Sequence, residues 1–363
     1  MITKVSIAAF KSLESLEIEL GRVNVFVGAN GSGKSNLLVA IGVLSAAADG
    51  KVNDQTLMQR GVRPGVPKLY KSAFPAGRRQ LPHIYLDATS PESHYGVTLN
   101  NPMNDPSPAW RFKTEMFERG CDKLVSRGPA MRDNPNTENG LAALRAVELK
   151  EGDSALDFLR RLQGYVIYSP TTPVLRGVAS ETQPRVPLGL SGGRLPDAVH
   201  ELLSGHKDNE TSKRVVRDVL LLISWAKSYG SAPSAELPLS QAASSSAKVI
   251  RFTDRYMKEG RNVLSGYDAS EGALYILFLA VLAVHPKAPL FFAIDNADHG
   301  LNPGLAKTLM MKFTDWVLTA SQERQILMTS HNPAVLDGLP LQDDRVRLFT
   351  VDRDTLEGLW KLE

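Results

Sequence analysis

The chain has 363 residues and a formal net charge of +3. This length allows a substantial buried core in one large domain or two ordinary ones. The nearly balanced charge excludes a protein that binds nucleic acid through its overall charge, so only local basic patches remain to be considered. The single cysteine, Cys121, excludes an intrachain disulfide framework.

The cellular location is predicted from features that the chain lacks. Its first ten residues have no basic region, apolar core and small-residue cleavage site of the kind found in secretory signals. The longest apolar stretch, residues 273–284, is shorter than the about 20 residues that span a bilayer. We therefore expect a soluble cytoplasmic protein without a membrane partner.

A complete phosphate-binding pattern, G-x-x-x-x-G-K-S, occupies residues 28–35, between strand-like runs in residues 2–27 and a helical run at residues 36–48. Glycines let successive backbone N–H groups converge on one anion, and the following helix adds the positive end of its dipole. In such a loop Lys34 reaches the β- and γ-phosphates, and Ser35 ligates Mg²⁺, which prefers oxygen ligands. The predicted nucleotide-binding residues of the loop are Asn30, Gly31, Ser32, Gly33, Lys34, Ser35 and Asn36.

The middle of the chain gives weaker signals. Residues 50–164 are irregular, with turn-rich clusters around short apolar runs. A short strand is expected at residues 165–168, and helices are expected at residues 197–203 and 211–227. Residues 230–247, rich in Ser, Ala and Pro, are predicted to be a flexible loop.

The last third alternates between strand and helix patterns, which predicts an α/β sheet. A helix begins at Glu271, a buried strand covers residues 289–294, a helix starts at Pro303, a strand covers residues 325–329, and two strand-like runs follow. We expect a nucleotide-binding core formed by residues 1–50 and 248–363. Residues 51–247 would be an insertion or lobe that includes the flexible loop at residues 230–247.

Two of these strands end in polar residues. Asp295 ends the first, and a carboxylate at the end of a buried strand is costly unless it has a partner. Mg²⁺ beside the phosphate loop would be that partner, so the predicted metal ligands are Ser35 and Asp295. The alternative is an ordinary surface aspartate. His331 ends the second strand and is either a contact for a γ-phosphate or attacking water, or a structural histidine.

These motifs resemble the ABC-type ATPase heads of the RecF, SMC and overcoming-lysogenisation-defect (OLD) group. The resemblance rests on Phe10-Lys11-Ser12, the phosphate loop, Asp295 with Asn302-Pro303 after it, and Ser330-His331-Asn332-Pro333. It implies a P-loop NTPase fold of the ABC-ATPase type, with a mixed sheet flanked by helices and an inserted irregular α+β segment. In that group two heads hold two ATP molecules between them, and each head offers a signature serine and glycine to the other's nucleotide. The resemblance therefore implies ATP as ligand and a homodimer.

Two segments compete for the signature. Leu190-Ser191-Gly192-Gly193 has the letters of the transporter motif but lies far upstream of Asp295, so we interpret it as a loop before a helix. Ser270-Glu271-Gly272 opens an apolar helix that leads directly into the Asp295 strand. A helix N-terminus with a hydroxyl and free N–H groups is an anion site, which favours Ser270 and Gly272 as signature residues. The alternative is a plain helix cap.

The sequence departs from the group at one catalytic position. The residue after the metal-binding aspartate is usually glutamate, but here it is Asn296. General-base assistance is worth about 10²–10⁴ in rate, so slow turnover is expected unless Asp298, His299 or His331 substitutes. Asn296 can also orient water without taking its proton. The predicted catalytic residues are Asn296, Asp298 and His331, and two readings stay open: a slow ATPase or an ATP-bound switch.

Other features of the group are not recognised. The glutamine that senses magnesium has four candidates, Gln55, Gln59, Gln80 and Gln163. No acidic Toprim motifs follow His331 and no long heptad runs interrupt the middle, so we expect neither the OLD-type nuclease nor coiled-coil arms.

Partners are expected on local evidence only. A basic run before Ser270 is either a contact for nucleic-acid phosphates or a solvated surface; its members are Lys248, Arg251, Arg255, Lys258 and Arg261. The leading hypothesis is a homodimeric, slowly hydrolysing ATPase that gates an effector protein or a nucleic-acid transaction in DNA maintenance or antiphage defence. The alternatives are a non-hydrolysing ATP-dependent scaffold whose partner carries the activity, and a P-loop kinase.

Overall fold

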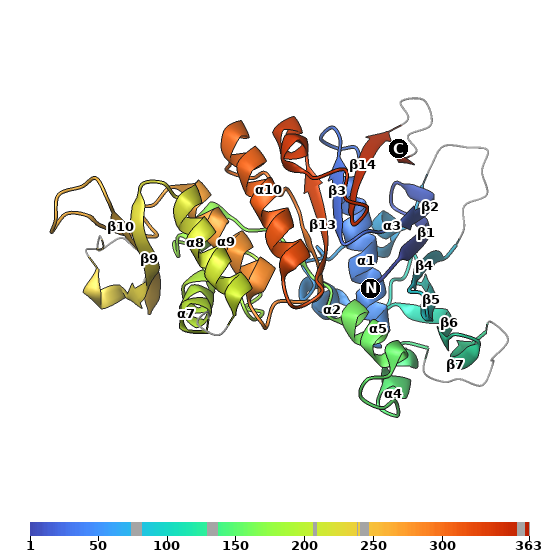
Figure 1. Ribbon diagram of the computed structural model, residues 1–363. Helices are drawn as coiled ribbons and strands as arrows, with labels where there is room; N and C mark the ends of the chain where they lie inside the picture. Colours follow the sequence, from blue (N-terminus) through green and yellow to red (C-terminus); the bar gives the residue numbers. More distant parts are fainter. Residues whose placement is uncertain are drawn as a thin grey trace.

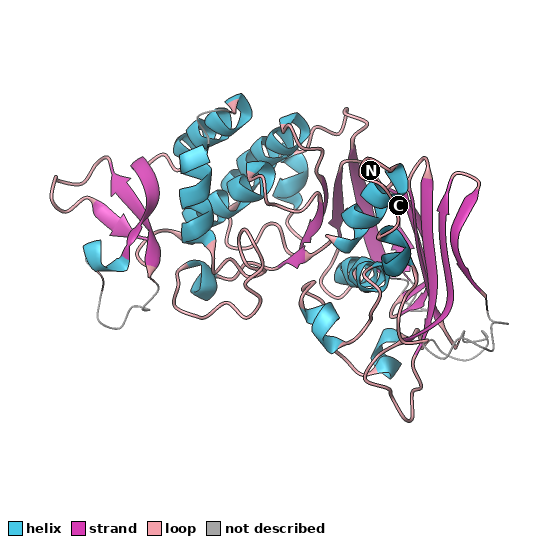
Figure 2. Ribbon diagram, turned by 90° about the horizontal axis from the view of Figure 1, so that it is seen from below, coloured by secondary structure: helices cyan, strands magenta, loops and turns pink. Residues whose placement is uncertain are grey.

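The computed structural model describes residues 1–73, 82–128, 137–205, 209–237, 239, 247–353 and 360–362. Its elements form successive layers, which Figure 1 shows from one side. A central, mostly parallel sheet lies between a group of helices and a second, antiparallel sheet, and a small third sheet lies beyond the helices (Figure 2). This arrangement is the α/β, mixed-sheet fold that the sequence predicts.

The central sheet has the strand order β15-β14-β3-β13-β12-β8. Its strands are β3 (Val23–Val27), β8 (Ile167–Tyr168), β12 (Phe291–Ile294), β13 (Gln325–Ser330), β14 (Val346–Arg353) and β15 (Trp360–Leu362). All neighbours pair in parallel except β14 and β15. Because β3 and β12 both pair in parallel with β13, the residues that follow the carboxyl ends of these three strands meet at one edge, and this edge carries the candidate site.

The antiparallel sheet has the order β2-β1-β4-β5-β6-β7. Its strands are β1 (Lys4–Phe10), β2 (Leu13–Glu19), β4 (Ile84–Thr89), β5 (Ser93–Asn100), β6 (Arg111–Arg119) and β7 (Asp122–Arg127). The expectation that residues 50–164 are irregular was therefore wrong for this part. In β5 the residues Tyr95, Val97 and Leu99 are fully buried, an alternation of inward and outward side chains that is typical of a half-buried strand.

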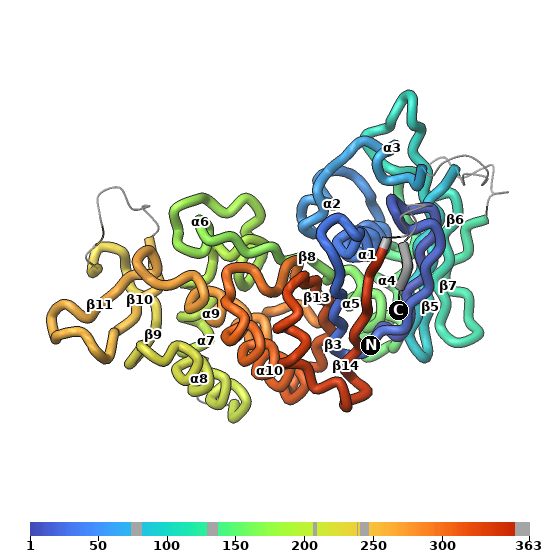
Figure 3. The backbone as a smooth tube through the Cα atoms, turned by 90° about the horizontal axis from the view of Figure 1, so that it is seen from above, coloured from blue at the N-terminus to red at the C-terminus, as the bar shows by residue number. Residues whose placement is uncertain are grey.

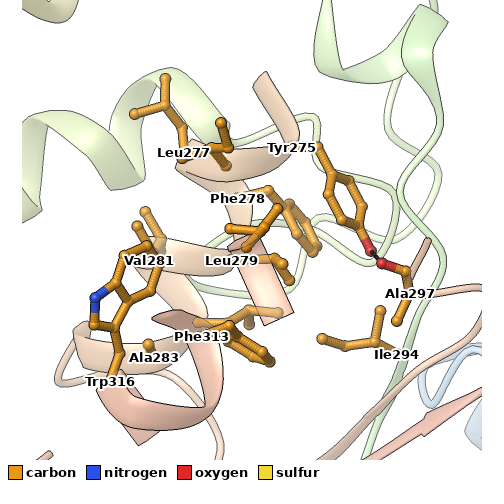
Figure 4. Packing of buried hydrophobic residues seen from close by; sticks show 14 of the residues in the cluster. Tyr275, Leu277, Phe278, Leu279, Val281, Ala283, Ile294, Ala297, Phe313 and Trp316 are labelled. Atoms are coloured by element: carbon orange, nitrogen blue, oxygen red, sulfur yellow. Dashed lines mark hydrogen bonds between the residues drawn. The ribbon is translucent and has the colours of Figure 1, made fainter. Parts of the chain in front are cut away.

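Two hydrophobic clusters lie on the two faces of the central sheet. One includes α1 (Lys34–Ala48), α5 (Ser154–Gln163) and the inner face of the antiparallel sheet. The other lies under α7 (Leu195–Gly205), α8 (Glu210–Leu222), α9 (Glu271–Val284) and α10 (Pro303–Thr319). Figure 4 shows Val281 of α9 beside Trp316 of α10, whereas Tyr275 near the start of α9 points to Ala297 and donates to its carbonyl oxygen. Helix α9 is apolar nearly all round, as expected for a helix inside the core, and eleven of its fourteen residues are buried.

The third sheet consists of β9 (Ala226–Pro233), β10 (Lys248–Asp254) and β11 (Val263–Ser265), and it lies at the far end of the molecule from the antiparallel sheet (Figure 3). It corrects two expectations. The helix predicted at residues 211–227 ends at Leu222, and the first residues of the predicted flexible loop 230–247 belong to β9, whose ladder with β10 runs from Ala226 to Pro233. Most of the rest of that loop lies outside the described residues.

Short elements connect these layers: α2 (Asp54–Met58), α3 (Pro67–Tyr70), α4 (Ala142–Ala146), α6 (Thr172–Leu175), η2 (Ser234–Glu236) and η3 (Pro333–Gly338). The proposed insertion 51–247 contributes to more than one layer, since β4 pairs with β1 and β8 pairs with β12. No helix in the described part of the chain is both long enough and apolar enough to cross a membrane.

Candidate nucleotide-binding site

The phosphate-loop pattern lies between the end of β3 and the start of α1, as its sequence context predicts. Gly31 and Gly33 have φ angles of 78° and 100°, which side chains other than glycine rarely adopt. At Gly28 a Cβ atom would lie 2.1 Å from the carbonyl oxygen of Val351, so the loop is packed against β14. The loop therefore depends on glycine both for its curl and for its close approach to the sheet.

Two polar side chains of the phosphate loop differ in their exposure to solvent. Asn30 is exposed, whereas Ser32 is buried and its Oγ has no hydrogen-bond partner among the described residues. An unpaired buried hydroxyl is costly, and a bound phosphate would supply the missing acceptor. At the start of α1, Asn36 Nδ2 donates to Ser12 Oγ at 2.8 Å, which joins the loop to the turn between β1 and β2.

Lys34 is folded back into its own loop. Its Nζ donates to the carbonyl oxygens of Gly28 at 2.7 Å and Ala29 at 2.8 Å. Burial lowers the pKa of Lys34, while the nearby carboxylates of Asp295 and Asp298 raise it. The ammonium group is thus held within the loop and close to two acids, where it can exchange carbonyl contacts for phosphate oxygens.

Ser35 and Asp295, the two predicted metal ligands, touch each other. The Oγ of Ser35 lies 2.9 Å and 3.1 Å from the two carboxylate oxygens of Asp295. Asp295 follows β12 directly, and its backbone N–H donates to Tyr168 of β8 at 2.9 Å. One hydroxyl and one carboxylate are the hard oxygen ligands that Mg²⁺ prefers, so the donor set fits this ion.

Thr329 is a member of the site that the sequence reading missed. It lies in the fully buried strand β13, and its Oγ1 donates to Asp295 Oδ1 at 2.6 Å. Thr329 Oγ1 also accepts a hydrogen bond from the backbone N–H of Asn296 at 2.8 Å. The sequence shows a threonine near the end of this strand. Its role depends on the pairing of β13 with β12, and the sequence does not reveal that pairing.

The three predicted catalytic residues are brought to the same edge of the sheet. Asn296 is exposed and has a left-handed backbone with φ 56°, a conformation that asparagine tolerates better than most residues. Asp298 is buried, and its Oδ2 lies 3.5 Å from Nδ1 of the half-exposed His331. Its other oxygen has no hydrogen-bond partner in the described part of the chain.

The predicted signature residues lie at the tip of α9. Ser270 is exposed and caps the helix, its Oγ accepting the N–H of Ala273 at 3.4 Å. A Cβ on Gly272 would lie 2.9 Å from a methyl group of Leu305 in α10, so Gly272 lies close against this helix. Among the described contacts, no hydrogen bond or ion pair joins this tip to residues 28–36 of the same chain.

The competing segment, residues 190–193, is a loop before α7, as predicted. The carboxylate of Glu181 accepts the backbone N–H groups of Ser191 at 3.0 Å and Gly193 at 3.1 Å. The loop therefore binds an acidic side chain of its own chain. Among the glutamine candidates, Gln163 donates to Ala48 at 3.0 Å on the far end of α1, and Gln80 lies outside the described residues.

The basic run lies on β10 and the turn that follows it. Lys248 forms an ion pair with Asp197 at 3.4 Å, and Arg255 donates to the carbonyl oxygen of Ala226 at 2.8 Å. Arg251, Lys258 and Arg261 are exposed. Tyr256 projects from the same turn with 78% of its surface exposed. This turn is thus a solvent-facing basic and aromatic surface.

Two family models match the sequence. Residues 1–77 match the family described as "AAA ATPase domain", and residues 181–337 match the one described as "AAA domain, putative AbiEii toxin, Type IV TA system". No curated protein matches the chain. The two matches contain the phosphate loop and the Asp295 strand, respectively.

Solved structures with a similar fold are SMC head domains. The chain is similar to the SMC head domain from Thermotoga maritima (16% identity, TM-score 0.49, covering 100% of this chain and 98% of that chain). It is similar to an SMC head bound to the C-terminal winged-helix domain of ScpA (13% identity, TM-score 0.58, covering 100% and 96%). A third is an SMC head with an extended coiled coil bound to the C-terminal domain of ScpA from Pyrococcus furiosus (12% identity, TM-score 0.55, covering 100% and 95%).

At these identities the structural likeness establishes the fold, and the family matches add the class of protein. Together they identify an ABC-type AAA ATPase of the RecF/SMC group, in agreement with the resemblance seen in the sequence. The chain is accordingly an ATP-binding ATPase of the P-loop type.

Proposed function

We propose that the protein is an ATP-dependent homodimer in which each chain holds Mg²⁺-ATP with Lys34, Ser35 and Asp295. The observation that carries this proposal is the contact between Ser35 and Asp295 at the carboxyl edge of the central sheet, with Lys34 folded into the adjacent loop. Bound Mg²⁺ would supply positive charge next to the transferred phosphate. The backbone N–H groups of Asn30, Gly31, Ser32 and Gly33, with the first turn of α1, which includes Asn36, would hold the phosphates.

A second chain would complete the site. Ser270 caps α9 and is exposed, so its hydroxyl and the first N–H groups of the helix are available to an anion from another molecule. The absence of a described contact between this tip and residues 28–36 of its own chain supports its use in trans. Closure of two chains on two nucleotides would bring Ser270 and Gly272 to the γ-phosphate.

Hydrolysis in this site is expected to be slow. Asn296 has an amide where related heads have a carboxylate, and an amide cannot take a proton from water. Asp298 would orient His331 through its Nδ1, which leaves the Nε2 of this half-exposed imidazole free to contact water or the γ-phosphate. The same substitution favours the alternative, a scaffold that closes on ATP without hydrolysing it and whose partner carries the activity.

The partner is expected at the basic surface formed by β10 and the turn after it, where Arg251 of β10 and Lys258, Arg261 and Tyr256 of the turn are exposed. Such a surface suits nucleic-acid phosphates or an acidic effector protein. The family description of a putative toxin of a type IV system supports antiphage defence as the setting, while the SMC-like fold supports DNA maintenance. In either case ATP-driven closure would gate the partner.

The proposal is tested by following dimerisation and phosphate release in one preparation, with and without Mg²⁺-ATP. Dimers with measurable release support the slow ATPase, and dimers without release support the scaffold. Ser270→Arg should bind ATP normally and stay monomeric. Asn209→Arg is the matched control, because Asn209 caps α8 through Ser212 at 3.1 Å in the same way. Normal dimerisation of Ser270→Arg with ATP would show that the signature assignment is wrong.

A further inference from the structure

Glu271, the residue between Ser270 and Gly272, makes contacts that neither neighbour makes. Its Oε1 accepts a hydrogen bond from Thr172 Oγ1 and lies 3.3 Å from Nε2 of His299. The Glu271 side chain is 30% exposed, so the contact lies at the edge of the core. Glu271 therefore joins the tip of α9 to two segments that are distant from it in sequence.

One of these segments is the loop that follows Asp295. Gly300 in this loop has φ 70°, and a Cβ there would lie 2.5 Å from the Cδ of Glu271. Gly272 of the same helix tip faces a methyl group of Leu305, in the first turn of α10. The Glu271 side chain therefore lies directly against the backbone of Gly300, so a movement of the loop changes the packing of the helix tip.

The other segment follows β8 and includes α6. Thr172 opens α6, and Arg176 after it donates to the carbonyl oxygen of Ala269 at 3.2 Å. At the other end of this segment, the carbonyl oxygen of Tyr168 accepts the N–H of Asp295 at 2.9 Å. Both segments that hold the α9 tip thus begin beside Asp295, at the edge of the sheet where the nucleotide is proposed to bind.

We propose that Glu271 is a positioning residue that links the two nucleotide sites of the dimer. Through its contacts with His299 and Thr172, Glu271 makes the position of the α9 tip depend on whether nucleotide is bound beside the Asp295 loop of its own chain. The same tip is presented to the nucleotide of the second chain. The inference rests on the two-chain site proposed above. Its consequence is that ATP bound by one chain favours ATP binding at the other site, by a coupling that linkage makes reciprocal.

The test compares Glu271→Ala with Glu210→Ala. Glu210 is also the first residue of a helix after a capping side chain, but its carboxylate pairs only with Lys213 among the described residues. ATP-driven dimerisation is measured by sedimentation over a range of ATP concentrations. We expect Glu271→Ala to need about tenfold more ATP for half-maximal dimerisation, a change within the usual range of site coupling. Glu210→Ala should behave like the unaltered chain.

Two further variants separate positioning from a general loss of structure. Glu271→Gln keeps the oxygen that accepts from Thr172, so its half-maximal ATP concentration should lie between those of the unaltered chain and Glu271→Ala. Combining Glu271→Ala with Ser270→Arg gives a monomer in which the ATP affinity of the single chain is measured, and this affinity should equal that of Ser270→Arg alone.

The outcomes distinguish the inference from the proposed function. If the unaltered chain does not dimerise with ATP, both are overturned. If it does, and Glu271→Ala follows the same ATP dependence as Glu210→Ala, only the role of Glu271 is overturned. Weaker ATP binding by the monomeric Glu271→Ala chain would also overturn it, because the residue would then act on its own nucleotide.

Discussion

The hydroxyl of Thr329 lies 2.6 Å from Asp295 Oδ1 and accepts the backbone N–H of Asn296 at 2.8 Å. One buried side chain of β13 therefore fixes both the proposed metal ligand and the backbone of the residue beside it. Its position matters because the left-handed conformation of Asn296 is held from the neighbouring strand.

Thr329→Val removes this hydroxyl while keeping the side-chain shape. It leaves the N–H of Asn296 without its acceptor and removes one of the two hydroxyl donors to Asp295 Oδ1, which should lower the free energy of unfolding by about 1–3 kcal/mol. We also expect a higher Mg²⁺ concentration to be needed for half-maximal ATP binding. Thr329→Ser keeps the hydroxyl and should restore the Mg²⁺ dependence. Equal Mg²⁺ dependence in Thr329→Val and the unaltered chain would mean that Thr329 serves stability alone.

Lys34→Ala should weaken ATP binding by about 100-fold, as expected for the loss of charge-assisted hydrogen bonds to phosphate. Titration calorimetry with Mg²⁺-ATP measures the change. The control is Lys307→Ala, an exposed lysine on α10. If both variants bind ATP alike, the loop that contains Lys34 does not hold the triphosphate.

Asn296→Glu is expected to speed phosphate release. A carboxylate at this position provides general-base assistance worth about 10²–10⁴. We expect the lower end of that range, because glutamate at φ 56° costs about 1 kcal/mol or more in backbone strain. Asn296→Gln has the same length and no carboxylate, so it is the control. Similar rates for the two variants would assign the limiting step to something other than proton removal.

The surroundings of His94 predict that the free energy of unfolding depends on pH, independently of the nucleotide site. A hydrogen bond to Asp87, with the charges of Asp87 and Glu118, raises the pKa of His94 above its usual 6.5 against the effect of burial. Because the pKa of His94 is higher in the folded state, its stabilisation of the fold is complete below about pH 6.5. This stabilisation is lost as the pH rises through the folded-state pKa.

This prediction is tested by urea unfolding at pH 6 and pH 9. His94→Gln should lower the free energy of unfolding by about 1–2 kcal/mol more at pH 6 than at pH 9, the scale of a partly buried charge-assisted hydrogen bond. His200→Gln, on the exposed surface of α7, should show no such difference. A larger loss at pH 9 for His94→Gln would contradict the direction of the pKa shift.

The sequence was most informative where the chemistry is local. Each motif lies within one short segment: the phosphate loop with its flanking elements, and the strand that ends in Asp295. The glycines and the lysine of the loop, and the aspartate at the end of the strand, are recognisable without knowing the fold. The helix starts at Glu271 and Pro303 were predicted for the same reason, since Ser270 and Asn302 cap them through Ala273 and Leu305.

What could not be predicted depends on strand partners far apart in the chain. Thr329 joins the site only because β13 pairs with β12, and the contact of Glu271 with Thr172 requires β8 to lie at the edge of the same sheet. Likewise β4 continues the N-terminal sheet because it pairs with β1 across a long connection. Local composition carries no information about such pairings.

Strand β3 lies between β13 and β14, both of which come from the last part of the chain. During translation, the strand that precedes the phosphate loop therefore leaves the ribosome with both hydrogen-bonding edges open, and it stays so until residues 325–353 have been made. Unpaired apolar strands invite intermolecular pairing. Premature termination before β13 would thus release a fragment that contains an intact phosphate-loop motif and is prone to aggregate.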